Sequence, residues 1–406
     1  MLCAAPRCRG LRFGWGAVSR FCSSAANRQR PMSMADFDPT VFERYYNRAE
    51  PFPDINLQQK WTRSSLLTRV QQLLSDYPPL LSRQLRPSWG QTEEGMLTQE
   101  GTLKEACNIR VMQWNVLSQG LCLGRDNFVR CPKEALQWNL RRLRMLEEIL
   151  QYDPDIMCLQ EVDHFGFLCP ILSAIGYDGA FCPKPDSPAL YVKDSNGPDG
   201  CCVFYKLNKF EFVDKDTVVL KADDAYTNQV SVVFTLRPRA LCSSSSIQQL
   251  CIATTHLKAK YGWEELRHKQ GSYLLDFLEK KVNRSDALLV CGDLNADCVE
   301  PVYNAFVQSS LKLSSAYKDL SPDGATEPNY TTWKIRGRTG PEGGEQHVCR
   351  TLDYIWYTDH ALKLKALLNF PTDEQIGQDR LPSFRYPSDH FSLVAEFALL
   401  KATESD

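Results

Sequence analysis

From about residue 108 onward, apolar runs of strand length alternate with helical segments, and few folds accommodate that order. The runs with strand character are Ile109–Leu117, Asp155–Val162, Cys201–Leu207, Gln229–Leu236, Leu250–Leu257, Ala287–Leu294, Leu352–Tyr357 and Ser392–Leu399. Between them, Lys133–Tyr152 and Trp263–Val282 carry apolar side chains at helical spacing. Strands that alternate with helices predict a layered α/β domain.

Polar residues interrupt these runs at their ends. Asn115, Glu161 and Asp293 each end a run, Asp353 opens one, and His390 precedes the last. A buried charge is costly unless it is paired or bound to a metal, so five such interruptions indicate side chains that converge on one polar site. Each alone has an ordinary structural explanation, as a turn, a cap or a hydrogen-bonded core residue. The prediction depends on the ordered set.

These residue types suit the hydrolysis of a phosphate ester. Mg²⁺ prefers carboxylate, amide and water oxygens, and hydrolysis also needs a placed water and a group that accepts its proton. A histidine oriented by a carboxylate meets several of those needs. Asp293 and Asn295 stand two apart in an extended run, so we expect them to face the same side and to address one substrate atom together.

With their neighbours, these residues resemble the motifs of the endonuclease/exonuclease/phosphatase superfamily. The matching stretches are Met112–Asn115, Leu159–Val162, Cys291–Asn295, Leu352–Tyr354 and Ser388–His390. The resemblance implies a four-layer α/β sandwich, in which two packed mixed β-sheets are flanked by helices. It also implies a phosphoesterase with Mg²⁺ as its cofactor.

The same resemblance assigns roles to the site residues. Glu161 and Asn115 would hold Mg²⁺, with Asp389 near the metal. Asp293 would activate or position the attacking water, and Asn295 would orient the phosphate. His390, paired with Asp353, would contact the phosphate. His256, in Thr255–Leu257, matches an extra phosphate-binding histidine of the deadenylase and sphingomyelinase branches.

Longer stretches resemble the nocturnin family within this superfamily. They are Arg125–Val129, Phe181–Pro185, Asn196–Cys201, Thr255–Lys258 and Thr331–Arg336, and the likeness covers about residues 108–400. It implies removal of the 2′-phosphate of NADP⁺ and NADPH, to give NAD⁺ and NADH, in a pocket lined by Lys184, Lys258, Lys260 and Arg336. Family members usually carry arginine at the position of Lys260. Because lysine lacks the bidentate fork of arginine, we expect a different substrate affinity.

Other functions stay open at this point. The same chemistry would serve a poly(A)-specific 3′ exoribonuclease acting on RNA. Without the resemblance, the simpler explanation of Lys258 and Lys260 is a solvated stripe on the surface. The formal charge of −2 argues against binding long nucleic acid by charge alone. A non-catalytic binding or regulatory protein would be expected to lack a motif, and all five are present. We expect a monomer, and no apolar run is long enough for a membrane span.

The amino-terminal quarter has a different composition. Residues 1–35 contain six arginines and no acidic residue, as in a mitochondrial transit peptide; a disordered basic tail is the alternative. Starts at Met32 or Met34 would give a cytoplasmic form. Residues 36–105 are polar and read as a linker or regulatory lead-in to a catalytic domain over 106–401. The 16 cysteines include no Cys-x-x-Cys pair, and we expect reduced core thiols.

Overall fold

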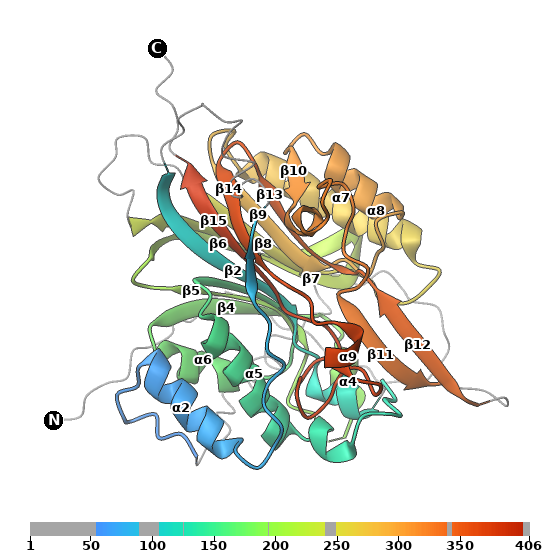
Figure 1. Ribbon diagram of the computed structural model, residues 1–406. Helices are drawn as coiled ribbons and strands as arrows, with labels where there is room; N and C mark the ends of the chain where they lie inside the picture. The colour runs from blue at the N-terminus through green and yellow to red at the C-terminus, as the bar shows by residue number, and fades with distance from the viewer. Residues whose placement is uncertain are drawn as a thin grey trace, which may run out of the picture.

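The computed structural model describes residues 54–88, 105–124, 126–193, 195–239, 249–338 and 343–400. Two mixed β-sheets pack face to face, and helices cover their outer faces (Figure 1). This is the four-layer α/β sandwich that the sequence predicted.

The larger sheet has seven strands, and its order brings both ends of the described chain together. In sheet order these are β1 (Leu85–Pro87), β14 (Leu362–Leu368), β15 (Leu393–Leu400), β2 (Glu105–Asn115), β3 (Ile156–Val162), β5 (Gly200–Lys206) and β4 (Tyr177–Pro183). β2 and β3 are parallel, and the chain between them forms α4 (Gln119–Gly124) and α5 (Trp138–Tyr152). The helices α2 (Arg63–Leu73) and α6 (Phe165–Ser173) lie on the same side of this sheet as α5 (Figure 1).

The second sheet has six strands and a similar arrangement. In sheet order these are β10 (Leu313–Ser315), β13 (Asp353–Thr358), β9 (Ala287–Asp293), β8 (Leu250–His256), β7 (Ala225–Pro238) and β6 (Phe210–Ala222). Here β8 and β9 are the parallel pair, connected through α7 (Glu264–Lys281), which packs with α8 (Pro301–Gln308). A separate hairpin, β11 (Thr332–Gly337) and β12 (Glu345–Arg350), stands at one end of the sandwich (Figure 1).

Alternation along the central strands divides the core. In β3, Ile156 and Cys158 belong to the cluster between the sheets, whereas Met157 and Leu159 pack in the cluster under α5 and α6. Successive side chains of a strand point to opposite faces. Both faces of the central strands are therefore apolar, which is why these strands read as continuous apolar runs.

The structure refines several predicted elements. The helix predicted over Lys133–Tyr152 is split, because Gln137 is extended (ψ 136°) between a 3₁₀ turn, Lys133–Leu136, and α5. The strands β4, β6 and β14 were not predicted. In β6 most outward side chains are partly exposed, so its sequence lacks an apolar run.

The linker interpretation of residues 36–105 is wrong over residues 54–88. Leu66 and Val70 of α2 are fully buried in the cluster under α5, and β1 pairs with β14. The buried Arg83 forms an ion pair with Glu148 of α5. Residues 54–88 therefore belong to the catalytic domain, which begins before residue 106. The expected transit peptide, 1–35, lies outside the described residues.

Most cysteines in the part of the chain that the structure describes lie in the core, as expected, but Cys298 and Cys349 are exposed. Cys158, Cys202, Cys251 and Cys291 are buried, and the 12 described cysteines are all free. Within the same ranges, no helix is both long and apolar enough to cross a membrane.

Candidate active site

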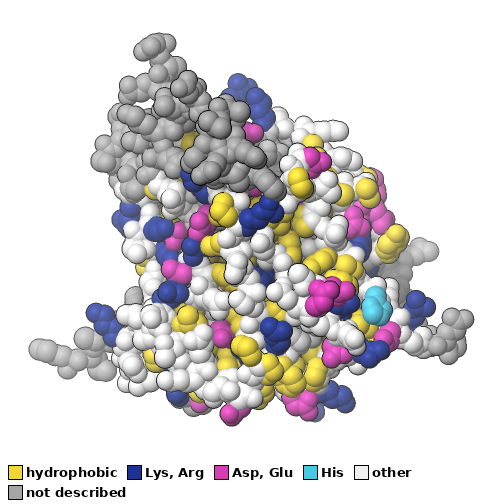
Figure 2. Space-filling view, viewed as in Figure 1, with side chains coloured by type: hydrophobic (Ala, Val, Ile, Leu, Met, Phe, Trp, Pro, Cys, Tyr) yellow, Lys and Arg dark blue, Asp and Glu magenta, His cyan; other side chains and the backbone are white. Residues whose placement is uncertain are grey.

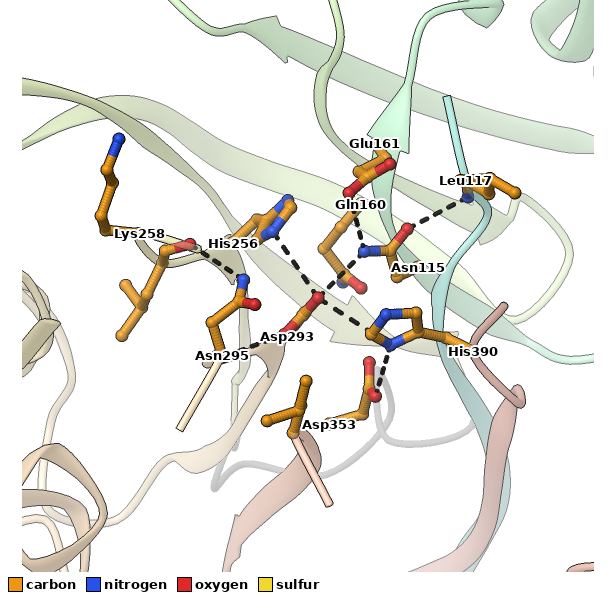
Figure 3. A network of polar contacts seen from close by, with 12 residues as sticks. Asn115, Leu117, Gln160, Glu161, His256, Lys258, Asp293, Asn295, Asp353 and His390 are labelled. Atoms are coloured by element: carbon orange, nitrogen blue, oxygen red, sulfur yellow. Dashed lines mark hydrogen bonds and ion pairs between the residues drawn. The ribbon is translucent and has the colours of Figure 1, made fainter. Parts of the chain in front are cut away.

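Four of the predicted site residues lie at the carboxyl ends of the two parallel strand pairs. Asn115 ends β2, Glu161 is next to last in β3, and His256 and Asp293 end β8 and β9. The antiparallel strand β13 starts at the same edge, where Asp353 lies opposite Asp293. The two sheets pack with these ends together, so the side chains converge (Figure 3).

Asn115 links the two sheets at the centre of this cluster. Its Nδ2 donates to Asp293 Oδ2 at 2.9 Å and lies 3.2 Å from Glu161 Oε1, while its Oδ1 accepts the Leu117 N–H at 3.0 Å (Figure 3). The amide has a fixed orientation because a donor and acceptors surround it on both sides.

Glu161 has the environment of a cation ligand. Desolvation and the nearby Asp126 raise the pKa of its carboxyl to about 7, although Lys184 opposes the shift. Its Oε2 accepts the Ser118 N–H at 3.1 Å. A carboxylate held beside other carboxylates gains from a metal ion, so Glu161 fits a divalent cation, whereas Asn115 turns its Nδ2 to Glu161 and would join the metal only through Oδ1, which accepts the Leu117 N–H.

His390 and Asp353 form the predicted pair. His390 Nδ1 lies 2.8 Å from Asp353 Oδ2. The same carboxylate accepts from Gln113 Nε2 at 2.8 Å and from Thr331 Oγ1 at 2.5 Å. Burial disfavours the charged imidazole, but Asp353, Asp389 and Asp293 together outweigh it and raise the pKa of His390 to about 9. The ring is therefore a cation at neutral pH.

The pKa values of His256 and Asp293 are shifted toward their uncharged forms. Burial, followed by the positive charges of Lys184 and His390, holds the pKa of His256 well below its usual range. Its Nε2 lies 3.6 Å from Asp293 Oδ2, and its buried Nδ1 has no hydrogen-bond partner among the described residues. Burial and Asp353 raise the pKa of Asp293 to about 6, which suits a proton acceptor near neutral pH.

The expected same-face relation of Asp293 and Asn295 is wrong. The strand ends at Asp293, and Asn295 adopts a left-handed backbone (φ 51°). Its N–H donates to Asp293 Oδ1 at 2.9 Å, and its Nδ2 lies 3.2 Å from the Leu257 carbonyl oxygen. The two residues still meet, but through a tight turn and not through strand alternation.

The predicted substrate lysines form a cluster of like charge. Lys184 is buried and pairs with Asp199 at 2.5 Å. Burial, then Lys260 and Lys184, lowers the pKa of Lys258. Its Nζ lies 5.2 Å from the Trp263 ring. Lys258 and Lys260 stand in a turn after β8, where Lys260 is exposed with φ 82°.

Arg336 lies on the other side of the site with a partner that the sequence analysis did not assign. It pairs with Asp126 at 2.7 Å and approaches Asp389 to 3.6 Å. The buried Lys334 is the nearer partner of Asp389. Burial would raise the pKa of Asp389, but Lys334, His390 and Arg336 hold it well below its usual range. Asp389 is thus an ionised carboxylate whose charge is already balanced by neighbouring cations, unlike that of Glu161.

The spacing of β11 could have revealed Lys334. Thr332, Lys334 and Arg336 stand two apart on one strand, and successive residues of a strand alternate between faces. Thr332 Oγ1 donates to the Asp389 carbonyl oxygen at 2.6 Å, so this face lines the site. An Arg336 assigned to the pocket therefore implies Lys334 beside it.

A second acidic group could also be considered for a metal. Asp293, Asp353 and His390 each place one ligand atom within 4.8 Å of the others. The hydrogen bond between His390 and Asp353 already explains that closeness. Glu161, whose hydrogen-bond donors are the neutral groups of Asn115 and Ser118, is the better candidate.

Comparisons with known proteins agree with this geometry. Residues 112–390 match the Endonuclease/Exonuclease/phosphatase family. Nocturnin of Xenopus laevis is 49% identical over 335 residues, which cover 82% of this chain and 81% of that protein. Nocturnin of Homo sapiens is 53% identical over 301 residues, and this chain covers only 66% of its length. The structure of the human nocturnin catalytic domain with bound sulfate superposes with a TM-score of 0.62 at 42% identity, covering 79% of this chain and 98% of that one. The chain therefore belongs to the endonuclease/exonuclease/phosphatase family and, within it, to the nocturnin group.

Proposed function

We propose that this phosphoesterase removes the 2′-phosphate of NADP⁺ and NADPH with Mg²⁺ as its cofactor. The observation that carries the proposal is the cluster of Lys184, Lys258 and Lys260, in which burial and then the charges of Lys260 and Lys184 lower the pKa of Lys258. Among the described residues, Asp199 is the carboxylate that pairs with this cluster, through Lys184. A ligand with concentrated negative charge would relieve the repulsion, and a phosphomonoester carries about two negative charges at neutral pH.

The site residues then divide the work. Mg²⁺, held by Glu161 and Asn115 with Asp389 beside it, would neutralise charge that develops on the phosphate. Asp293 accepts the proton of the attacking water, since its pKa of about 6 leaves it mostly ionised at pH 7. Asn295 orients the phosphate.

The two histidines act as donors of different charge. His390 is an imidazolium, fixed by Asp353 at Nδ1, and donates to a phosphate oxygen. His256 stays neutral and would donate from Nε2, the ring nitrogen that lies beside Asp293. Neutral and cationic donors on one phosphate stabilise the charge that builds in the transition state.

A 3′ exoribonuclease acting on poly(A) is the alternative. The relative Ccr4 of Saccharomyces cerevisiae, described as a 3′-5′-exoribonuclease subunit, is 26% identical over 327 residues. A polymer-binding enzyme would be expected to spread its cations along a track. On the face shown in Figure 2, basic side chains of the described residues are interspersed with acidic ones, so this face shows no such track.

A substrate panel tests the proposal. The purified full chain is the right sample because residues 54–88 are part of the folded domain. With Mg²⁺ present, we expect phosphate release from NADPH and NADP⁺ and an intact oligo(A), and no release by Asp293→Asn. If oligo(A) is shortened and neither dinucleotide releases phosphate, the phosphatase proposal is wrong and the exoribonuclease is supported instead.

We also propose that residues 1–35 direct import into mitochondria and that products starting at Met32 or Met34 stay cytoplasmic. A fluorescent reporter fused after residue 35, with both internal methionines replaced, should reach mitochondria. A diffuse cytosolic signal would contradict the proposal. We propose a monomer, which light scattering of the purified chain would check.

A further inference from the structure

A buried arginine lies beneath two loops of the active site. Arg141 of α5 is fully buried. Its Nε donates to the Pro387 carbonyl oxygen at 2.8 Å. One terminal nitrogen donates to the carbonyl oxygens of Val116 at 2.8 Å and Leu117 at 2.5 Å, and the other to Gln119 Oε1 at 2.6 Å. One guanidinium therefore holds loop 116–119 and loop 387–390 together.

Loop 116–119 sets the proposed metal side of the site. The Leu117 N–H donates to Asn115 Oδ1 at 3.0 Å, and the Ser118 N–H donates to Glu161 Oε2 at 3.1 Å. A shift of this loop would therefore move the amide of Asn115 and the carboxylate of Glu161.

Loop 387–390 sets the phosphate side, since it carries Asp389 and His390. It comes from the opposite end of the chain. Ser388 Oγ donates to the Asn115 carbonyl oxygen at 2.6 Å and makes a second link between the loops. The distance between the metal ligands and His390 thus depends on how these two loops are joined.

Arg141 differs from three other buried arginines. Arg83, Arg144 and Arg267 each pair with a glutamate, which is Glu148, Glu147 and Glu300 respectively. Within the described ranges, Arg141 has no carboxylate partner, and its acceptors are three loop carbonyls and one side-chain amide. A buried charge without a counterion is costly. The charged guanidinium of Arg141 instead donates hydrogen bonds to the loop backbone, and such charge-assisted hydrogen bonds are strong and directional.

We infer that Arg141 is a positioning residue that keeps the metal side and the phosphate side of the active site at a fixed separation. Only a planar fork with several donors reaches both loops at once, so lysine would lose at least one of them. A misplacement of about 1 Å can lower a catalytic rate by about 100-fold. The inference uses the proposed phosphatase activity for its kinetic assay, and loop exchange supplies a readout that does not depend on it.

Arg144 provides a matched control on the same helix. It is as deeply buried, with 2% exposure of its side chain. It donates to the Phe384 carbonyl oxygen at 3.0 Å and to that of Pro78, and neither residue belongs to the site. Arg144→Lys should therefore lower thermal stability without moving loops 116–119 and 387–390.

The experiment compares Arg141→Lys with Arg144→Lys in the full chain. For Arg141→Lys we expect a kcat for NADPH at least about tenfold lower, a KM within about threefold, and a higher Mg²⁺ half-saturation. Hydrogen exchange of peptides spanning 116–119 and 387–391 should rise in Arg141→Lys and stay at the wild-type rate in Arg144→Lys.

The results that would contradict a positioning role for Arg141 are specific. Wild-type kcat and exchange in Arg141→Lys, or equal losses in both variants, would overturn the inference. If the wild type released no phosphate from NADPH, the proposed function would fail, and the exchange rates would still decide the role of Arg141. If Arg141→Lys does not fold, Ser388→Ala removes the second link between the loops. It should lower kcat and raise the Mg²⁺ requirement, and full activity would count against a coupling of the loops.

Discussion

Replacing Arg83 tests whether the amino-terminal segment is part of the catalytic domain. The side chains of Arg83 and Glu148 are both fully buried. Arg83 donates to the Ser392 carbonyl oxygen at 2.8 Å and lies 3.3 Å from the Tyr386 hydroxyl. Glu148 accepts from the same hydroxyl at 3.0 Å and from Ser392 Oγ at 2.7 Å. Tyr386 and Ser392 flank the segment that carries His390.

Arg83→Met keeps most of the side-chain volume and removes the guanidinium. Glu148 then remains buried without its cation, and breaking a buried ion pair in this way costs about 3–5 kcal/mol of unfolding free energy. Adding Glu148→Leu removes the stranded charge. Because apolar replacement of a whole buried pair is often neutral, we expect the double variant to recover most of the loss.

Urea denaturation followed by tryptophan fluorescence measures these differences. Arg130→Met is the control, since Arg130 and Glu345 form a surface pair with side-chain exposures of 51% and 35%. We expect a much smaller change there, because exposed pairs contribute little. The reasoning is refuted if Arg83→Met costs no more than Arg130→Met, or if Glu148→Leu adds a further loss to Arg83→Met.

Three more predictions concern the site. Glu161→Gln should abolish phosphate release and Mg²⁺-induced stabilisation with an unchanged circular dichroism spectrum; normal turnover at saturating Mg²⁺ would contradict its role. The Mg²⁺ half-saturation should rise as the pH falls from about 8 to about 6, since Glu161, with a pKa of about 7, must lose a proton before a cation binds; a constant half-saturation would contradict this. Lys260→Arg should lower the KM for NADPH by offering a bidentate fork, and Lys260→Ala should raise KM more than it lowers kcat. Initial rates measure both, and an unchanged KM in each variant would place Lys260 outside the pocket.

The sequence located the site because its polar residues stand out. Asn115, Glu161 and Asp293 interrupt apolar runs, and parallel strands bring such ends to one edge. Lys334 does not stand out in this way, since it lies in a polar hairpin and meets Asp389 only after folding. Tertiary contact decides its role, and the spacing of β11 indicates it only once Arg336 has been assigned to the site.

Helix α5 shows a second limit. Arg141, Arg144 and Glu148 would suit a solvent-facing stripe, yet all three are buried. The groups that cover them come from far along the chain: Pro387 accepts from Arg141, Pro78 and Phe384 accept from Arg144, and Arg83 pairs with Glu148. Burial of one polar stripe therefore depends on distant segments of the chain.

The strand order of the larger sheet also has a consequence for synthesis. β15 lies between β14 and β2, and β1 pairs with β14, so the earliest described strands need the last ones as neighbours. A chain leaves the ribosome from its amino terminus. Arg83 and Asn115 therefore emerge long before their partners Ser392 and Ser388. A nascent chain still lacking these residues has no complete catalytic centre, and hydrolysis can begin only once the whole polypeptide is free.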